Sequence, residues 1–196
     1  GHPAKPGAKR HGEIALQHQT GHQGNHAYRH GIHTHRQLRA HRKHGIGRRQ
    51  QQRKQVGKEI HGFCSGIGTG GTITGIGEKL KEANPNMTIW AVEPENAAIL
   101  AGGTIGTHLQ MGIGDGLIPG VLDTSCYEEI CIISDEEAIQ VSKDLASKEG
   151  IMCGISSGTN VAAALKLAEK LGPGKTVVTV LPDTAERYFS TPLFGE

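Results

Sequence analysis

Short apolar runs and amphipathic stretches alternate from Gly62 onward, and no other feature of the sequence restricts its fold as strongly. Four apolar runs are typical of buried strands, residues 61–67, 87–94, 128–134 and 175–182, and residues 151–158 predict a further short strand and turn. Three stretches have helical periodicity, residues 71–84, 135–150 and 159–172. Strands that alternate with helices form βαβ units, so we expect an α/β fold, a parallel sheet flanked by helices.

The helix predicted at 135–150 has recognisable signals at both ends. Ser134 precedes it and Glu137 follows three residues later, which is the spacing of a capping box. Gly150 is a typical residue at a helix C-terminus.

The stretch GIGTGGTITG, residues 66–75, joins the first predicted strand to the first predicted helix, and it contains five glycines and three threonines. Glycines let a backbone approach a ligand closely and adopt positive φ, and a helix N-terminus presents free N–H groups. Thr69, Thr72 and Thr74 add hydroxyl donors. The pattern predicts an anion site, for which phosphate is the natural ligand.

The glycine stretch alone does not identify the molecule that carries the phosphate. It lacks the Gly-Lys-Ser/Thr of a Walker loop. Its G-x-G-x-x-G spelling, with Glu93 at about the right distance for a ribose hydroxyl, leaves a dinucleotide site open. A tight strand-to-helix turn without a ligand is the remaining alternative, although it explains five glycines and interleaved threonines less well.

A second polar turn, GISSGTN at residues 154–160, also ends a predicted strand and opens a predicted helix. Ser156 and Ser157 are either helix caps, the commoner role of such residues, or ligand contacts. The carboxyl ends of parallel strands lie at one edge of a sheet, so Ser156 can face the same ligand as the glycine stretch.

Five motifs in order resemble the C-terminal portion of the pyridoxal-phosphate-dependent cysteine synthases, also called O-acetylserine sulfhydrylases. They are GIGTGGTITG, AVEPENAAILAGG, GIGDGLIPGVLD, KEGIMCGISSG and ERYFSTPLF, and the resemblance extends from about Val56 to Phe194. It implies the large-domain fold of fold-type II pyridoxal-phosphate enzymes. The residues that it places on the cofactor phosphate are Gly68, Thr69, Gly70, Gly71 and Thr72. Ser156 resembles the serine that hydrogen-bonds the pyridine nitrogen of the cofactor.

By this resemblance the reaction is a β-replacement, in which acetate leaves O-acetylserine and sulfide takes its place to give cysteine. A neutral serine hydroxyl at the ring nitrogen fits this chemistry. Cystathionine β-synthase shares the glycine stretch and the serine, whereas GIGDGLIPGVLD and ERYFSTPLF favour cysteine synthase. The intact family enzyme is expected to be a cytoplasmic homodimer that can bind serine acetyltransferase.

The family's reactive lysine lies in a stretch resembling SVKDR, and a substrate loop resembles TSGNTG, but neither string occurs in this sequence. That lysine binds the cofactor covalently and then removes the α-proton of the substrate. Lys58 is the lysine nearest to the glycine stretch, yet we assign it no role and leave the catalytic residues unassigned. We therefore expect the chain to be incomplete and inactive alone.

Residues 1–55 differ in composition from residues 56–196, and we place a boundary between them. From Gly1 to Ile60 there are thirteen Lys and Arg residues, two acidic residues and ten of the 12 histidines, although the whole chain has a net charge of +2. Because this segment has few large apolar residues, we predict that it is disordered. Our favoured explanation is a sequence foreign to the family, such as translation in a wrong frame, which the other frames of the coding DNA would test.

A non-catalytic binding protein that acts through this basic segment is the second hypothesis. Its charge would attract nucleic acid, although Tyr28 is the one aromatic residue available for stacking, which disfavours that partner. Its histidines can bind zinc, copper or nickel, but their spacing is irregular, and we predict no metal site.

The cysteine pattern and the hydropathy of the sequence both indicate where in the cell the protein is expected. The four cysteines form no Cys-x-x-Cys pair, so we expect reduced thiols in a cytoplasmic protein. No apolar run reaches the ~18 residues of a membrane helix and no signal peptide is recognisable, so we expect no membrane contact.

Overall fold

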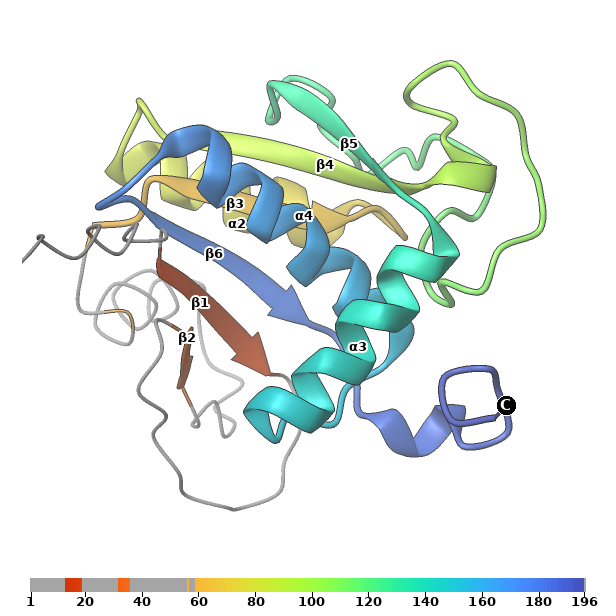
Figure 1. Cartoon of the computed structure of the whole chain (residues 1–196). Coiled ribbons are helices and arrows are strands. Elements are labelled where there is room, and N and C mark those ends of the chain that lie inside the picture. The colour runs from red at the N-terminus through yellow and green to blue at the C-terminus, as the bar shows by residue number, and fades with distance from the viewer. Residues whose placement is uncertain (1–12, 19–31, 36–55, 57–58, 196) are drawn as a thin grey trace, which may run out of the picture.

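A computed structural model describes residues 13–18, 32–35, 56 and 59–195 (Figure 1). In these residues six strands form one sheet in the order β2-β1-β6-β3-β4-β5, and every neighbouring pair is parallel. The strands are β1 (Glu13–His18), β2 (Ile32–His35), β3 (Gly62–Gly66), β4 (Thr88–Pro94), β5 (Glu129–Ile133) and β6 (Thr176–Leu181). The helices are α2 (Gly71–Ala83), α3 (Asp135–Glu149) and α4 (Ile155–Leu171), with short 3-10 helices η1 (Glu95–Ala97) and η2 (Ala185–Tyr188). The predicted α/β class is confirmed.

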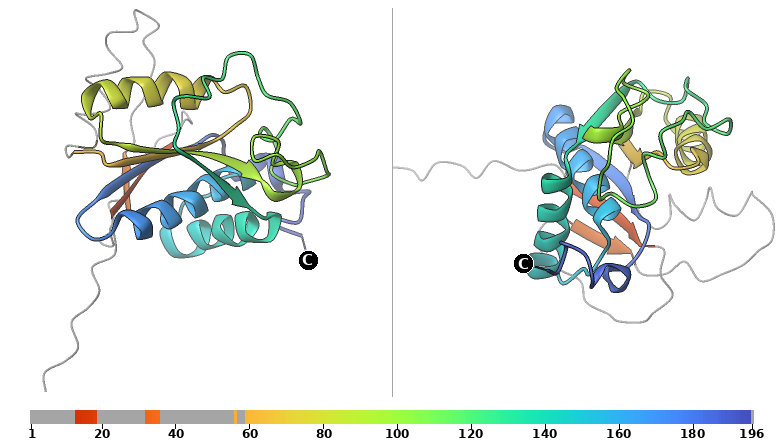
Figure 2. Two further views of the ribbon diagram at one scale, coloured as in Figure 1. Left: turned by 90° about the horizontal axis from the view of Figure 1, so that it is seen from above. Right: turned by 90° about the vertical axis from the view of Figure 1, so that its right-hand side faces the viewer.

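Helices cover both faces of the sheet, α2 on one side and α3 with α4 on the other (Figure 2). Neighbouring residues of β3 and of β4 divide between the two layers. Phe63 and Ile89 pack in the apolar cluster beside α2, whereas Cys64 and Trp90 pack in the cluster beside α4. Strands buried on both faces read as continuous apolar runs, which is why the sequence revealed them.

The Ser134 cap and the Gly150 stop predicted for α3 are confirmed, whereas the Glu137 carboxylate accepts from Lys166 at 2.8 Å and does not complete a capping box. The Ser134 hydroxyl accepts a hydrogen bond from the Glu137 N–H at 3.2 Å, and Gly150 ends the helix with φ of +68°. Glycine adopts this left-handed conformation without the steric penalty of a Cβ atom.

The strand predicted within residues 151–158 is wrong. Cys153 forms an isolated antiparallel bridge with Thr184, and α4 begins at Ile155, before the predicted start at residue 159. The start of α4 packs closely on α3, since a Cβ atom at Gly158 would lie 2.0 Å from the carbonyl oxygen of Ala138. This turn therefore belongs to the helical layer and not to the sheet.

The basic segment contains two strands that the sequence did not lead us to expect. β1 pairs with β6 from Glu13 opposite Thr176 to His18 opposite Leu181, and β2 pairs with β1. β1 contains one of the few apolar alternations of this segment, Ile14 and Leu16. The other residues of 1–55 lie outside the described ranges, and they include the arginines and most of the histidines on which the nucleic-acid and metal hypotheses depend. His33 and His35 lie in β2. The foreign origin of this segment stays a prediction.

Candidate functional site

The glycine loop, residues 66–71, leaves β3 and leads directly into α2. Its first N–H, that of Gly66, donates to the side-chain oxygen of Asn160 at 2.7 Å. Gly70 occupies the position before the helix with φ of +81°. Thr69, Gly71 and the first helical threonine, Thr72, are exposed. The loop therefore begins anchored in the core and ends open to solvent.

Protein contacts explain two of the glycines in this loop. A Cβ atom at Gly68 would lie 2.5 Å from the carbonyl oxygen of Gly112, and one at Gly70 would lie 2.7 Å from the Cβ of Leu122. The segment 112–122 thus packs directly on the loop, and the Gly114 N–H donates to the Ile67 carbonyl at 2.9 Å. The tight strand-to-helix turn considered from the sequence is therefore present. It does not explain why residue 71 is a glycine, because a Cβ atom there meets nothing closer than 3.7 Å.

The start of α2 presents hydrogen-bond donors without acceptors in the described part of the chain. The first helical hydrogen bond runs from the Thr74 N–H to the Gly70 carbonyl, so the N–H groups of residues 71–73 precede the helical ladder. No side chain caps this helix and no acidic residue lies in its first turn. By contrast, α3 has its Ser134 cap and three acidic residues in the first turn. An anion at the start of α2 would satisfy both the free donors and the helix dipole.

One of the three threonines expected to donate to an anion has another partner. The Thr74 hydroxyl accepts from the Asp123 N–H at 3.0 Å and donates to the Val121 carbonyl at 3.4 Å. Thr74 therefore holds the segment 112–122 and its continuation against α2. Thr69 and Thr72 remain as hydroxyl donors at the open end of the loop.

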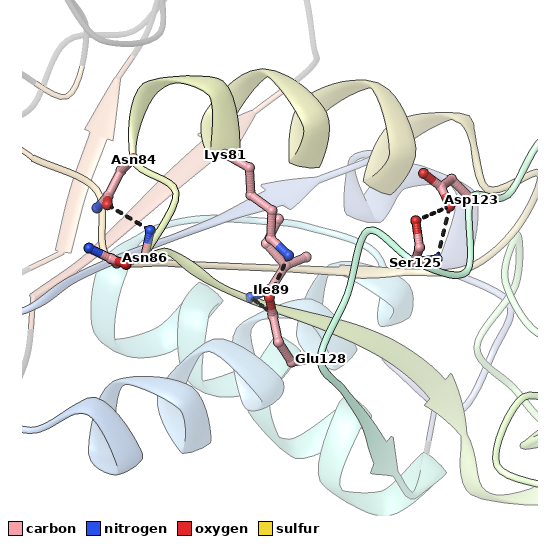
Figure 3. A network of polar contacts seen from close by, with 7 residues as sticks. All are labelled: Lys81, Asn84, Asn86, Ile89, Asp123, Ser125 and Glu128. Carbon is pink, nitrogen blue, oxygen red and sulfur yellow. Dashed lines mark hydrogen bonds and ion pairs between the residues drawn. The ribbon is translucent and has the colours of Figure 1, made fainter.

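The far end of α2 is held by a polar network centred on Glu128 (Figure 3). One carboxylate oxygen of Glu128 accepts from Lys81 of α2, and the other accepts from the Ile89 N–H of β4. The Glu128 N–H also donates to the Ile89 carbonyl at 2.9 Å. Asp123 accepts from the hydroxyl and N–H of Ser125 in the preceding turn. The Lys81 contact therefore links the far end of α2 to Glu128, which in turn is bonded to β4.

Ser156 lies in the first turn of α4 and is buried, with 3% of its surface exposed. The cap position belongs to Gly154, and no side chain caps the helix, so neither Ser156 nor Ser157 is the cap considered from sequence. Within the described residues the Ser156 hydroxyl has no hydrogen-bond partner. The hydroxyl in this turn that is itself buried and has no hydrogen-bond partner among the described residues is that of Ser157.

Asn160 joins this helical turn to the glycine loop, and we did not single it out from sequence. It lies one helical turn after Ser156, so the two side chains project from the same face of α4. Its oxygen accepts from the Gly66 N–H, and its NH₂ donates to the Val180 carbonyl of β6 at 2.8 Å. The structure therefore brings the two predicted site segments to one edge of the sheet. The detectable signal was an amide within the apolar stretch of α4.

Glu93, the residue that could have bound a ribose hydroxyl in a dinucleotide site, is hydrogen-bonded to backbone N–H groups. Its carboxylate accepts from the N–H groups of Leu100 and Ala101 at 2.9 and 3.1 Å, and the side chain is 4% exposed. A carboxylate engaged in this way shapes the turn after β4 and is not available to a ribose. Glu93 therefore does not support a dinucleotide site.

The thiols are poor nucleophiles in this environment. All four cysteines are free, and burial raises the pKa of Cys64 to about 12 and that of Cys153 to about 11. Within the described residues no group of three His, Cys, Asp or Glu side chains can hold a metal, and no helix is long and apolar enough to cross a membrane. Lys58 lies outside the described residues.

Comparison with known proteins gives the same outline. Residues 32–183 match the family described as "Pyridoxal-phosphate dependent enzyme", and this match begins before the change of composition near Val56. The cysteine synthase of Staphylococcus aureus (strain Mu50 / ATCC 700699) is 49% identical over 139 residues, which are 71% of this chain and 45% of that protein. The chain therefore spans about half the length of the curated relatives that it matches.

Solved structures resemble the fold as well. An O-acetylserine sulfhydrylase, isoform 3 from Entamoeba histolytica, superposes with a TM-score of 0.72 at 36% identity, over 75% of this chain and 44% of that one. An O-ureido-L-serine synthase superposes with a TM-score of 0.69 at 40% identity, over 74% of this chain and 48% of that one.

Proposed function

Because the chain belongs to the family of pyridoxal-phosphate dependent enzymes, we propose that residues 59–195 form the part of a cysteine synthase-type site that binds the cofactor. In this proposal the loop residues Gly68–Thr72 bind the phosphate and Ser156 binds the pyridine nitrogen. The two segments lie at the same edge of the sheet, linked through Asn160.

The uncapped start of α2 carries the proposal. The N–H groups of residues 71–73 and the exposed hydroxyls of Thr69 and Thr72 are donors, and a phosphate dianion is the acceptor that such a set fits best. Gly71 has space for a Cβ atom in the protein, so its lack of a side chain is explained by the approach of a ligand.

Ser156 supplies a neutral hydrogen-bond partner. When bound, pyridoxal phosphate withdraws electrons from the α-carbon of an amino acid, which lets a substituent leave the β-carbon. A hydroxyl at the pyridine nitrogen tunes that electron withdrawal less strongly than a carboxylate does. The position of Ser156 supports its assignment to the ring, because it lies in the first turn of α4, at the same edge of the sheet as the glycine loop.

For the whole enzyme we propose β-replacement on O-acetylserine by sulfide, giving cysteine and acetate. The names of the curated and structural relatives support this substrate class. The printed sequence has no stretch resembling that of the family's reactive lysine. We therefore propose that this chain alone binds the cofactor without turning the substrates over.

We also retain, as proposals, a boundary near residue 55, a cytoplasmic location and a homodimer that can bind serine acetyltransferase. Self-association is supported by apolar side chains that are more than half exposed and lie close together in sequence, Ile105, Met111, Leu117, Ile118 and Val121. Apolar side chains this exposed are typical of surfaces that another protein or domain covers.

Titration with pyridoxal phosphate, followed by borohydride reduction and peptide mass mapping, tests this function. We expect saturable binding with one site per chain and no single lysine that is labelled stoichiometrically. One saturable lysine adduct would contradict the proposed inactivity, and turnover of O-acetylserine with sulfide should then be assayed. Scattered labelling without saturation would contradict the cofactor site itself.

A further inference from the structure

The segment after β6 lies against the start of α4. Cys153 and Thr184 form the isolated antiparallel bridge, and the Gly154 N–H points at the Asp183 carbonyl at 3.4 Å. This contact joins the last described part of the chain to the helix that carries Ser156 (Figure 1).

Asp183 and Tyr188 form a hydrogen-bonded pair at this junction. The Tyr188 hydroxyl donates to Asp183 Oδ2 at 2.6 Å, and Tyr188 is 5% exposed. Burial and the neighbouring carboxylate raise the pKa of Tyr188, so the hydroxyl remains a donor throughout the working pH range. The second carboxylate oxygen, Oδ1, is buried and has no hydrogen-bond partner within the described residues.

This pair sits on Gly154. A Cβ atom at Gly154 would lie 2.2 Å from Asp183 Oδ1 and 2.4 Å from Tyr188 Cε2. The first turn of α4 contains no acidic residue of its own, so the Asp183 carboxylate also supplies the negative charge that a helix N-terminus favours.

The other side of Gly154 is fixed by α3. The Ser142 hydroxyl donates to the Gly154 carbonyl at 2.9 Å in a buried bond. Gly154 is therefore held between α3 and the Asp183–Tyr188 pair, and Ser156 follows it by two residues in the same turn.

We propose that Asp183 and Tyr188 are positioning residues that orient the Ser156 hydroxyl toward the pyridine ring through their contact with Gly154. This inference rests on the proposed function, because it needs Ser156 to bind the ring. Neither residue is proposed to touch the ring itself. Their effect on the ligand passes through the backbone of the first turn of α4.

A double-mutant cycle of Tyr188→Phe and Ser156→Ala in the full chain tests the inference. The probe is 4′-deoxypyridoxine 5′-phosphate, which keeps the ring and the phosphate and has no aldehyde to react with lysines. Tyr127→Phe is the matched control, because Tyr127 packs beside the α2 cluster and its hydroxyl makes no hydrogen bond in the described residues. Each variant is also melted to measure its stability.

We expect Ser156→Ala to weaken probe binding about fivefold, the loss of one neutral hydrogen bond, and Tyr188→Phe to weaken it about threefold to fivefold. In the Ser156→Ala background Tyr188→Phe should weaken binding less than twofold, since the hydroxyl that it orients is gone. Tyr127→Phe should leave affinity unchanged.

The outcomes separate the two claims. Saturable binding with independent, multiplicative losses in the double variant would overturn the positioning role and leave the proposed function standing. A fall in thermal stability in Tyr188→Phe with unchanged affinity would also overturn it, since the pair would then be structural only. Failure of the wild-type chain to bind the probe would overturn the proposed function, and this inference with it.

Discussion

Gly68→Ala in the glycine loop and Gly75→Ala in the following helix α2 are matched substitutions, and the structure predicts opposite effects of the two on stability. A Cβ atom at Gly68 would lie 2.5 Å from the Gly112 carbonyl oxygen, about 0.9 Å short of the 3.4 Å at which ordinary contact begins. A Cβ atom at Gly75 meets nothing within 4 Å, and the residue lies inside α2.

The glycine loop must move to accept Gly68→Ala, because its contact is with backbone. Overpacking of this kind costs about 1–3 kcal/mol, which lowers the melting temperature of a chain of this size by about 2–12 °C. Gly75→Ala gains about 0.5–1 kcal/mol, because alanine has the higher helix propensity, and should raise the melting temperature by about 1–4 °C.

Thermal melts followed by circular dichroism, together with dialysis against pyridoxal phosphate, measure both effects. We expect Gly68→Ala to weaken cofactor binding at least tenfold, since the displaced loop no longer presents its donors, and Gly75→Ala to leave it unchanged. A Gly68→Ala variant with wild-type stability and affinity would refute both the packing argument and the assignment of the phosphate to this loop.

Three further predictions concern the elements that position the site. Ser134→Ala removes the cap of α3 and should cost about 1 kcal/mol of unfolding free energy in urea titrations, while a cost near zero would show that the cap is replaced. Glu93→Ala leaves two backbone N–H groups unpaired, so we expect a loss of about 2–5 kcal/mol, and a loss below about 1 kcal/mol would contradict the role of Glu93 in the turn after β4. The pKa of Cys64 is raised from 9.0 to about 12 in the folded chain, so its contribution to stability is complete below pH 9 and lost as the pH rises toward 12. Between these values Cys64→Ala should lose stability less steeply than wild type, by about 1.4 kcal/mol per pH unit, and parallel curves would contradict the burial of this thiol.

The strands and helices beyond Gly62 were predictable because each carries a local signal. β4 and β6 are buried on both faces and read as continuous apolar runs, and α3 is marked by Ser134 at one end and Gly150 at the other. The start of α4 was not predicted, and the residues there pack against α3 through a tertiary contact at Gly158. No local pattern encodes a contact between two helices.

Some residues of the candidate site were likewise predictable from the sequence, and others were not. The glycine loop and Ser156 were visible as polar turns that follow apolar runs, so their place at one edge of the sheet followed from the parallel order of strands. The roles of Asn160 and Glu93 depend on partners distant in sequence or on the path of a turn, and hydrogen-bonded partners cannot be read from residue type. Thr74 shows the same limit, because its hydroxyl serves the segment 112–122 and its continuation.

We expect the free donors at the start of α2 to bind the phosphate of the cofactor. Equilibrium dialysis of the wild-type chain with 4′-deoxypyridoxine 5′-phosphate and with 4′-deoxypyridoxine measures that contribution directly, because the two ligands differ only in the phosphate. Charge-assisted hydrogen bonds of about 1.5–3 kcal/mol each predict that the phosphorylated ligand binds at least roughly a hundredfold more tightly. Equal affinity for the two ligands would contradict the assignment of this loop to phosphate.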